Sequence, residues 1–288
     1  MIFSKIKKIL KIPYIKYKSF YLSRIHNKKY EAICILGNNY KIIRGTLQST
    51  SDYDDAWLYF LSQKANVVFD IGCHIGKSAL IISQSDSIKR LVLVDPNPLS
   101  LSLAAENLII NNISQNAIFI PKAAYVNSGD QIQLWTMKGP FAGASININF
   151  TDTGTITKEY FEVETITLDK IADIYNLYPD LIKIDVEGAE NCVLQGATEI
   201  AKRENAIFIV EVHSSKKMSI MKNTDRILHW CKQNNYRSYY LSKHREIKNS
   251  DLVKNRGRYH LLLIHKNTNY PEGLLNIKQG ANLEDISK

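Results

Sequence analysis

The stretch Val67-Val68-Phe69-Asp70-Ile71-Gly72-Cys73-His74-Ile75-Gly76 decides how this chain of 288 residues folds. Its apolar run ends in the pattern Asp-x-Gly-x-x-x-Gly, and a helical pattern begins directly after it at Lys77. This order predicts a buried strand, a tight turn and the start of a helix. In such a turn the backbone N–H groups approach a bound nucleotide-like ligand closely.

The spacing within this turn differs from that of a dinucleotide site, which reads Gly-x-Gly-x-x-Gly. Asp70 stands where the first glycine would be, and the two glycines that follow lie four positions apart. A carboxylate here suits a ligand with a cationic amino group, such as S-adenosylmethionine, and disfavours a pyrophosphate. We expect the turn and the helix start to bind this cofactor through Asp70, Gly72, Cys73, His74, Gly76, Lys77 and Ser78. For His74 the alternative is that the side chain points to solvent.

A second apolar run, Leu91–Val94, ends in Asp95 about one βαβ repeat further along the chain. An acidic residue at this strand end is placed to accept hydrogen bonds from both hydroxyls of a ribose. The alternative is that Asp95, Pro96 and Asn97 only open a helix, because these residue types favour helix N-termini. Both roles can hold together, so we place these three residues beside the cofactor, with Asn97 or a neighbour as the cap.

A third apolar run, Leu181–Ile184, leads into Asp185 and Glu187 and then into another helical pattern. Carboxylates at the C-terminal edge of a parallel strand face the ligand crevice. We expect Asp185 near the methionine end of the cofactor. Glu187 follows in the turn, as a contact for substrate or metal or as an N-terminal charge on the next helix. Amino-group methyltransferases carry an Asn/Asp-Pro-Pro-aromatic tetrapeptide here, and this chain does not.

The run Ile207–His213 places Glu211 and His213 two residues apart, and therefore on the same face of a strand. A histidine beside a carboxylate is oriented and made more basic. We predict that His213 is a general base or orients the acceptor, with Glu211 behind it; the alternative is a polar strand end bonded to loop backbone. The candidate catalytic residues are thus Asp185, Glu187, Glu211 and His213. These four could also hold Mg²⁺, but the spacing is not diagnostic and we predict no metal site.

Strand and helix patterns alternate from Val67 onward, with strands expected over 67–71, 91–95, 117–121, 181–185 and 206–212. This alternation predicts an α/β fold with a doubly wound, mostly parallel sheet. Two last runs, 236–241 and 259–265, predict an antiparallel edge pair.

With these motifs in order, the chain resembles the FkbM family of S-adenosylmethionine-dependent methyltransferases. The matching segments lie within residues 50–215, at 68–76, 94–98, 165–169 and 182–196. The resemblance implies the class I, Rossmann-like methyltransferase fold and O-methylation of sugars in glycans or of natural products. It also implies that Ala123 and Ala124 leave room for the adenine ring. Cys73, His74 and Asp95 depart from the residues usual in the family.

The N-terminal part is strongly basic, and it accounts for much of the net charge of +9. Residues 1–30 carry nine lysines and arginines and no acid. We interpret residues 1–50 as an extension, with a β-hairpin around Gly37-Asn38-Asn39. Its basic segment is a solvated helix at the domain edge or, alternatively, a peripheral contact with anionic membrane lipid. Nucleic-acid binding is less favoured, because no interleaved aromatic platform is present.

The remaining chain is expected to form a methyltransferase domain over 51–267 and a loosely held tail over 268–288. Residues 129–168 interrupt the βαβ alternation with three short strand patterns, at 131–136, 146–150 and 161–166. Long insertions at the ligand edge of such sheets often carry function, so we expect this one to cover the substrate side. Its Trp135, Phe141 and Tyr160 are candidates for stacking on a sugar or an apolar acceptor.

Composition limits the cellular compartments and the function classes that fit this chain. The chain has no apolar run long enough for a membrane span, and its N-terminus does not read as a secretory signal. Four scattered cysteines favour free thiols in a reducing cytoplasm and no zinc site. The function that fits best is methyl transfer to a hydroxyl of a small molecule or glycan. The alternatives are an RNA-directed methyltransferase, a Rossmann-type dehydrogenase, and a non-catalytic binding module.

Overall fold

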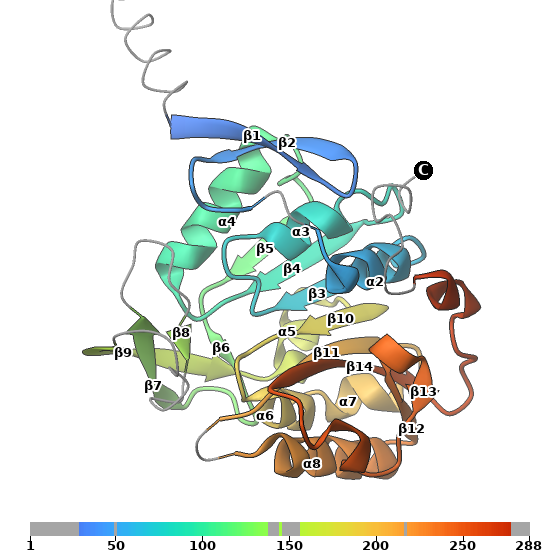
Figure 1. The fold of residues 1–288 in the computed structure, drawn as a ribbon. Coiled ribbons are helices and arrows are strands. Elements are labelled where there is room, and N and C mark those ends of the chain that lie inside the picture. Colours follow the sequence, from blue (N-terminus) through green and yellow to red (C-terminus); the bar gives the residue numbers. More distant parts are fainter. Residues whose placement is uncertain (1–28, 49–50, 138–143, 146–155, 216–217, 278–288) are drawn as a thin grey trace, which may run out of the picture.

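The computed structural model describes residues 29–48, 51–137, 144–145, 156–215 and 218–277 (Figure 1). Within these residues the largest sheet has eight strands, in the order β13-β12-β14-β11-β10-β3-β4-β5. Its parallel part consists of β3 (Val67–Ile71), β4 (Arg90–Val94), β5 (Ala117–Ile120), β10 (Leu181–Ile184) and β11 (Ile207–His213). Its antiparallel part consists of β12 (Tyr236–Tyr240), β13 (Arg245–Glu246) and β14 (Arg258–His265).

Helices cover both faces of this sheet because its strands are apolar on both sides. Val68 of β3 belongs to one core and its neighbour Phe69 to the other, as the alternation of strand side chains requires. One face is covered by α2 (Tyr53–Ser62), α3 (Lys77–Ile82) and α4 (Pro98–Ile110). The other is covered by α5 (Leu168–Tyr175), α6 (Glu190–Gln195), α7 (Thr198–Lys202) and α8 (Ile220–Gln233). The predicted doubly wound, Rossmann-like α/β fold is confirmed, and β12 and β14 form the predicted antiparallel pair, with β13 outside it.

The hairpin is also present, but its turn lies elsewhere. Strands β1 (Tyr30–Ile35) and β2 (Asn38–Ile43) are joined by Leu36 and Gly37, which have φ of 47° and 78°. We expected the turn at residues 37–39. A two-residue turn with two positive φ angles matches the twist of the strands better, and it buries Leu36. The hairpin packs along α4 (Figure 1), where Asn107 accepts a hydrogen bond from the Ile43 N–H at 2.9 Å.

The insertion forms most of a second sheet, in the order β6-β9-β7-β8. Its strands are β6 (Ala123–Ala124), β7 (Gln131–Met137), β8 (Ala144–Ser145) and β9 (Ile156–Ile166). The ring centres of Trp135 and Tyr160 lie 4.9 Å apart, so the two rings contact each other. The strand expected at 146–150 and the stacking candidate Phe141 lie outside the described residues.

Part of the predicted loose tail packs against the domain instead. Three short 3-10 helices follow β12: η1 (Leu241–Lys243), η2 (Asp251–Val253) and η3 (Glu272–Asn276). In η3, Leu274 is fully buried, and a Cβ on Gly273 would lie 2.3 Å from the ring of Phe60 in α2, so a larger residue there would force the ring to move. The buried Leu274 therefore holds residues 272–277 against the domain, which the polar composition of the tail did not indicate. The basic segment 1–28, with its predicted membrane contact, lies outside the described part of the chain. No helix in the described ranges is long and apolar enough to cross a bilayer.

Candidate active site

Two cavities open side by side at the carboxyl edge of the parallel strands. The first has a volume of about 290 Å³ and the second of about 430 Å³. Both are lined by Gly72, His74 and Asp185, so these residues form the wall where the two cavities meet. This is the edge at which ligands bind in open α/β sheets.

The first cavity gathers predicted cofactor residues from four segments. Besides the shared wall it is lined by Asp95 and Pro96 after β4 and by Ala123 and Ala124 of β6. The Asp95 carboxylate accepts hydrogen bonds from the backbone N–H groups of His74 at 2.9 Å and Asn97 at 2.8 Å. Burial raises the pKa of Asp95 to about 6, although both bonds oppose the shift. A carboxylate is thus held rigidly in the cavity wall.

Asn97 serves the helix rather than the cavity. Its side chain accepts a hydrogen bond from the Leu99 N–H at 3.1 Å and caps α4, and Asn97 lines neither cavity. Asn97 is therefore the predicted cap, but it lies outside both cavities and not in the predicted cofactor site. The ribose contact of Asp95 stays a prediction.

Asp70 departs from the prediction most clearly. Its side chain is completely buried and lines neither cavity. The Ser78 hydroxyl donates to one carboxylate oxygen at 2.5 Å, and the Lys183 ammonium lies 3.6 Å from the other. Because Asp70 is fully buried, is engaged by Ser78 and Lys183, and lines neither cavity, the structure shows it stabilising the turn and does not place it at the predicted ligand contact.

The two glycines of the turn have different structural roles. Gly72 has φ of +76°, and a Cβ there would lie 1.8 Å from the Asp185 carbonyl oxygen. Only glycine lets the turn pass this close to the end of β10. Gly76 has φ of +89° and packs against Ala104 of α4, where a Cβ would meet the alanine methyl at 3.1 Å. Gly76 lines neither cavity, so what the structure shows for it is helix packing, and its predicted cofactor contact stays a prediction.

Three further residues predicted to bind the cofactor line only the second cavity, namely Cys73, Lys77 and Ser78. Lys77 forms an ion pair of 2.5 Å with Asp55 of α2. Burial raises the pKa of the Cys73 thiol well above its usual value, so this group stays a neutral thiol. The polar groups of Lys77 and Ser78 are thus engaged with the carboxylates of Asp55 and Asp70, and these contacts could not be predicted from local sequence patterns.

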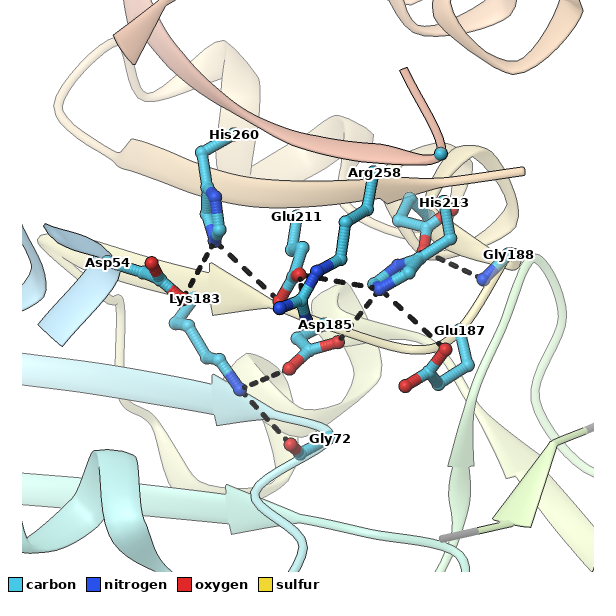
Figure 2. Close-up of polar contacts among 12 residues, drawn as sticks. Asp54, Gly72, Lys183, Asp185, Glu187, Gly188, Glu211, His213, Arg258 and His260 are labelled. Carbon is cyan, nitrogen blue, oxygen red and sulfur yellow. Dashed lines mark hydrogen bonds and ion pairs between the residues drawn. The ribbon is translucent and has the colours of Figure 1, made fainter. Parts of the chain in front are cut away.

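The four predicted catalytic residues converge around one imidazole (Figure 2). His213 is buried at the end of β11, and its Nε2 faces three carboxylates. Nε2 lies 3.5 Å from Glu211, 3.6 Å from Glu187 and 4.0 Å from Asp185. Residues of β11 and of the loop after β10 therefore meet at one point near the shared wall.

The group behind His213 is Glu190, not Glu211 as predicted. The fully buried Glu190 carboxylate lies 3.0 Å from His213 Nδ1, on the side of the ring away from the other acids. It also accepts hydrogen bonds of 2.8 Å from the Gly188 N–H and the Asn223 side-chain amide. The same amide nitrogen donates to the His213 carbonyl at 3.0 Å. Glu190 stands in the motif after β10, but nothing in the sequence shows that α6 and α8 bring it and Asn223 to β11.

Lys183 is a second residue that sequence reasoning missed. It lies within the apolar run of β10, and its ammonium group lies 3.3 Å from Asp185 and 3.6 Å from Asp70. It also donates a hydrogen bond of 3.2 Å to the Gly72 carbonyl (Figure 2). Burial opposes its charge, but Asp185 and Asp70 hold the pKa of Lys183 above its usual value. Lys183 thus ties the glycine turn to Asp185 across the shared wall.

With this geometry in place, comparison with known proteins decides the family. The model of the methyltransferase FkbM domain matches residues 70–238, which is more than half of the chain. The chain belongs to the FkbM methyltransferase family. This match confirms the family that the motifs resemble. A search of curated proteins found no match to the sequence.

Several solved structures are similar in outline at low sequence identity. The crystal structure of methyltransferase FkbM from Methylobacillus flagellatus KT has 17% identity and a TM-score of 0.43, covering 69% of this chain and 43% of that one. The Bacillus cereus O-methyltransferase in complex with SAH has 13% identity and a TM-score of 0.43, covering 74% and 80%. M. jannaschii TYW2 in complex with AdoMet has 12% identity and a TM-score of 0.40, covering 82% and 84%.

The FkbM site holds His213 in its charged form. Burial works against the charge, but hydrogen bonds to Glu190 and Glu211 outweigh it and raise the pKa of His213 to about 11. Burial raises the pKa of Glu187 to about 6, with the charge on His213 opposing the shift. Burial also acts to raise the pKa of Glu211, but His213, His260 and Arg258 bring it down to about 2. At neutral pH the site thus presents an imidazolium among carboxylates, which favours His213 as an orienting group over His213 as a base.

Among the residues that the structure describes, two groups of side chains could offer ligand atoms to a metal ion. One consists of Asp185, Glu211 and His213, and the other of Asp54, Glu211 and His260. Carboxylate oxygens and imidazole nitrogens suit several divalent ions. However, Glu211 belongs to both groups, and the Arg258 guanidinium already lies 3.0 Å from it. That the enzyme needs no metal stays a prediction.

Proposed function

We propose that this FkbM methyltransferase transfers a methyl group from S-adenosylmethionine to a hydroxyl group of a sugar or glycan. The observation that carries the proposal is the pair of cavities that meet at Gly72, His74 and Asp185. One cavity suits the cofactor and the other suits a polyhydroxylated acceptor. When bound, S-adenosylmethionine supplies a methyl group already activated by its positively charged sulfur.

The residues of the first cavity fit the cofactor. The fixed Asp95 carboxylate is placed to accept hydrogen bonds from a ribose diol, and each such charge-assisted bond contributes about 1.5–3 kcal/mol. Ala123 and Ala124 leave space for a flat ring on the other side. Asp185, in the shared wall, lies where a cationic sulfonium would be stabilised. The protein's main contribution is to hold the acceptor oxygen in line with the methyl group, and such positioning supplies roughly 7–11 kcal/mol.

The second cavity is lined by polar side chains of both signs, which suits a sugar better than an apolar natural product. Its donors and acceptors come from four elements and include Asp54, Lys183, Glu211, Arg258 and His260. Sugars offer many hydroxyl groups that both donate and accept hydrogen bonds, and such groups bind best where each finds a partner. The insertion borders the first cavity through Leu134 of β7, so its assignment to the substrate side stays a prediction.

A hydroxyl acceptor must also lose a proton, and we assign its removal to Glu187. A protonated His213 is unable to accept a proton, and Glu211, with a pKa of about 2, is a weak base. Glu187 has a pKa of about 6, which is close to the value that serves general base catalysis near neutral pH. Its side chain is 41% exposed beside the first cavity. His213, held through Nδ1 by Glu190, then uses its Nε2–H to orient Glu187; His213 itself lines neither cavity, so it acts on the acceptor through Glu187.

An assay of methyl transfer tests this proposal. Purified protein is incubated with S-adenosylmethionine that carries a labelled methyl group and with matched acceptors, a methyl glycoside and its amino-sugar counterpart. We expect label on an oxygen of the glycoside, S-adenosylhomocysteine as the second product, and no reaction when NAD replaces the cofactor. Label on nitrogen alone, or no binding of either adenosyl compound by the folded protein, would contradict the proposal.

A further inference from the structure

The segment between β12 and β14 lies at the same edge of the sheet as the candidate active site. Strand β14 pairs antiparallel with β11, and its first residue, Arg258, lies opposite His213. Strand β12 pairs antiparallel with β14, and its last residue, Tyr240, lies opposite Leu261. Residues 241–257 therefore leave and re-enter the sheet where β11 ends at His213.

This segment is strongly basic and exposed. Five exposed cationic side chains stand against two exposed acids, Glu246 and Asp251. The cations are Lys243, Arg245, Lys248, Lys254 and Arg256. Such an excess of positive charge attracts anions, most strongly where several cations border one cavity.

Part of the segment lines a third cavity of about 370 Å³. Lys243 and Arg256 line it from the segment, together with Arg258 of β14 and Trp57 of α2. The third cavity shares Asp54, Arg258 and His260 with the second cavity, so the two are neighbours through one common wall. An acceptor that occupies the second cavity can extend directly into the third.

The two neighbouring cavities differ in charge. Four acids line the second cavity, whereas one acid, Asp54, lines the third. Arg258 lines both cavities, and its guanidinium is already paired with Glu211 at 3.0 Å (Figure 2). In the third cavity, neither Lys243 nor Arg256 has a carboxylate partner among the residues that the structure describes; Arg256 instead lies 6.0 Å from the centre of the Tyr240 ring. Charge-assisted hydrogen bonds from such groups to carboxylate or phosphate oxygens are about twice as strong as neutral ones.

We propose that the third cavity binds an anionic group of the acceptor, so that the substrate is an acidic or phosphorylated saccharide. Lys243 and Arg256 hold its carboxylate or phosphate, while its hydroxyl groups reach the second cavity beside Glu211 and His260. This inference rests on the proposed function and names the substrate class of the same site.

Binding of three small probes tests the inference. Calorimetry at low salt compares glucose, glucuronate and glucose 1-phosphate, each added to the full chain with and without S-adenosylhomocysteine. The site variant is Lys243→Gln with Arg256→Gln. The matched control is Lys248→Gln with Lys254→Gln, which removes the same charge from the same segment outside the third cavity.

We expect at least one charged sugar to bind roughly tenfold more tightly than glucose to the native protein and to the control. The site variant should lose this preference and leave the affinity for glucose unchanged. Preference for glucuronate alone would identify a carboxylate, and preference for glucose 1-phosphate alone a phosphate. Equal binding of all three sugars, or an equal loss in both double variants, would overturn the inference. Failure of the proposed function is separate, since S-adenosylhomocysteine would then not bind while the preference persists.

Discussion

The first and the second cavity of this FkbM domain are assembled in different ways. The first is built almost entirely from the loops that directly follow consecutive strands of the sheet, at Gly72, Asp95, Ala123 and Asp185. The second adds residues from the segment after the hairpin, from α2 and from β14, such as Asp54 and His260, which lie about 200 positions apart in the chain. A cavity made by a repeating strand–loop–helix unit can be recognised from sequence, whereas one made by distant elements is visible only after folding.

The largest effect is expected at Glu187, which lines the first cavity two positions after Asp185 of the shared wall. Replacing Glu187→Gln should lower kcat roughly 10²–10⁴-fold, because the carboxylate that accepts the acceptor proton is lost. Because Glu187 also lines the first cavity, the affinity for S-adenosylhomocysteine is measured alongside, and kcat should fall far more than this affinity. The activity of the native enzyme should rise with pH through about 6, the pKa of Glu187, and this limb should vanish in the variant. Glu199→Gln, on the surface of α7, serves as control, and an unchanged kcat in Glu187→Gln would remove Glu187 as the base.

The next largest effect concerns the buried support of His213. Glu190→Ala leaves the imidazolium and two N–H donors without their acceptor, and removing one partner of a buried ion pair costs about 3–5 kcal/mol of unfolding free energy. Glu190→Gln keeps an acceptor oxygen and should lose less. Urea unfolding measures both variants. If Glu190→Ala and Glu190→Gln were equally stable to within error, this network would not hold the site together.

The pH dependence of unfolding also tests whether His213 is charged in the folded protein. The pKa of His213 is about 11 in the folded protein, above the value of about 6.5 expected in an unfolded chain. Between these values the folded state binds more protons, so stability falls as pH rises. The contribution of His213 is complete below about pH 6.5 and is lost as the pH approaches 11. Urea unfolding from pH 6 to 10 should show a shallower decline for His213→Gln, and parallel curves would argue against a charged His213.

The smallest effect expected tests a residue that sequence reasoning placed beside the cofactor. Asn97→Ala removes the cap of α4 and should cost about 1 kcal/mol of unfolding free energy. Its effect on the affinity for S-adenosylhomocysteine should be smaller than that of Asp95→Ala, because only Asp95 lines the first cavity. The reverse order of the two variants would return Asn97 to the cofactor site.

The same contrast explains which parts of the fold and of the site could be predicted from the sequence. The strands, the glycine turn and the acids at strand ends follow from local patterns, so the fold and most of the first cavity could be predicted. Asp70 was misplaced because the pattern gives its position in the strand but not Ser78 and Lys183, which engage it from both sides. Glu190 and Asn223 were missed because their role depends on how α6 and α8 pack against β11.

The central claim is that the first cavity binds the methyl donor and the second binds the acceptor. Calorimetric titration with S-adenosylhomocysteine tests it most directly, with Asp95→Ala for the first cavity and His260→Gln for the second. We predict that Asp95→Ala weakens binding roughly tenfold or more, as expected for the loss of a charge-assisted hydrogen bond, while His260→Gln leaves the affinity within about twofold. Equal weakening in both variants, or an effect of His260→Gln alone, would contradict this division of the site.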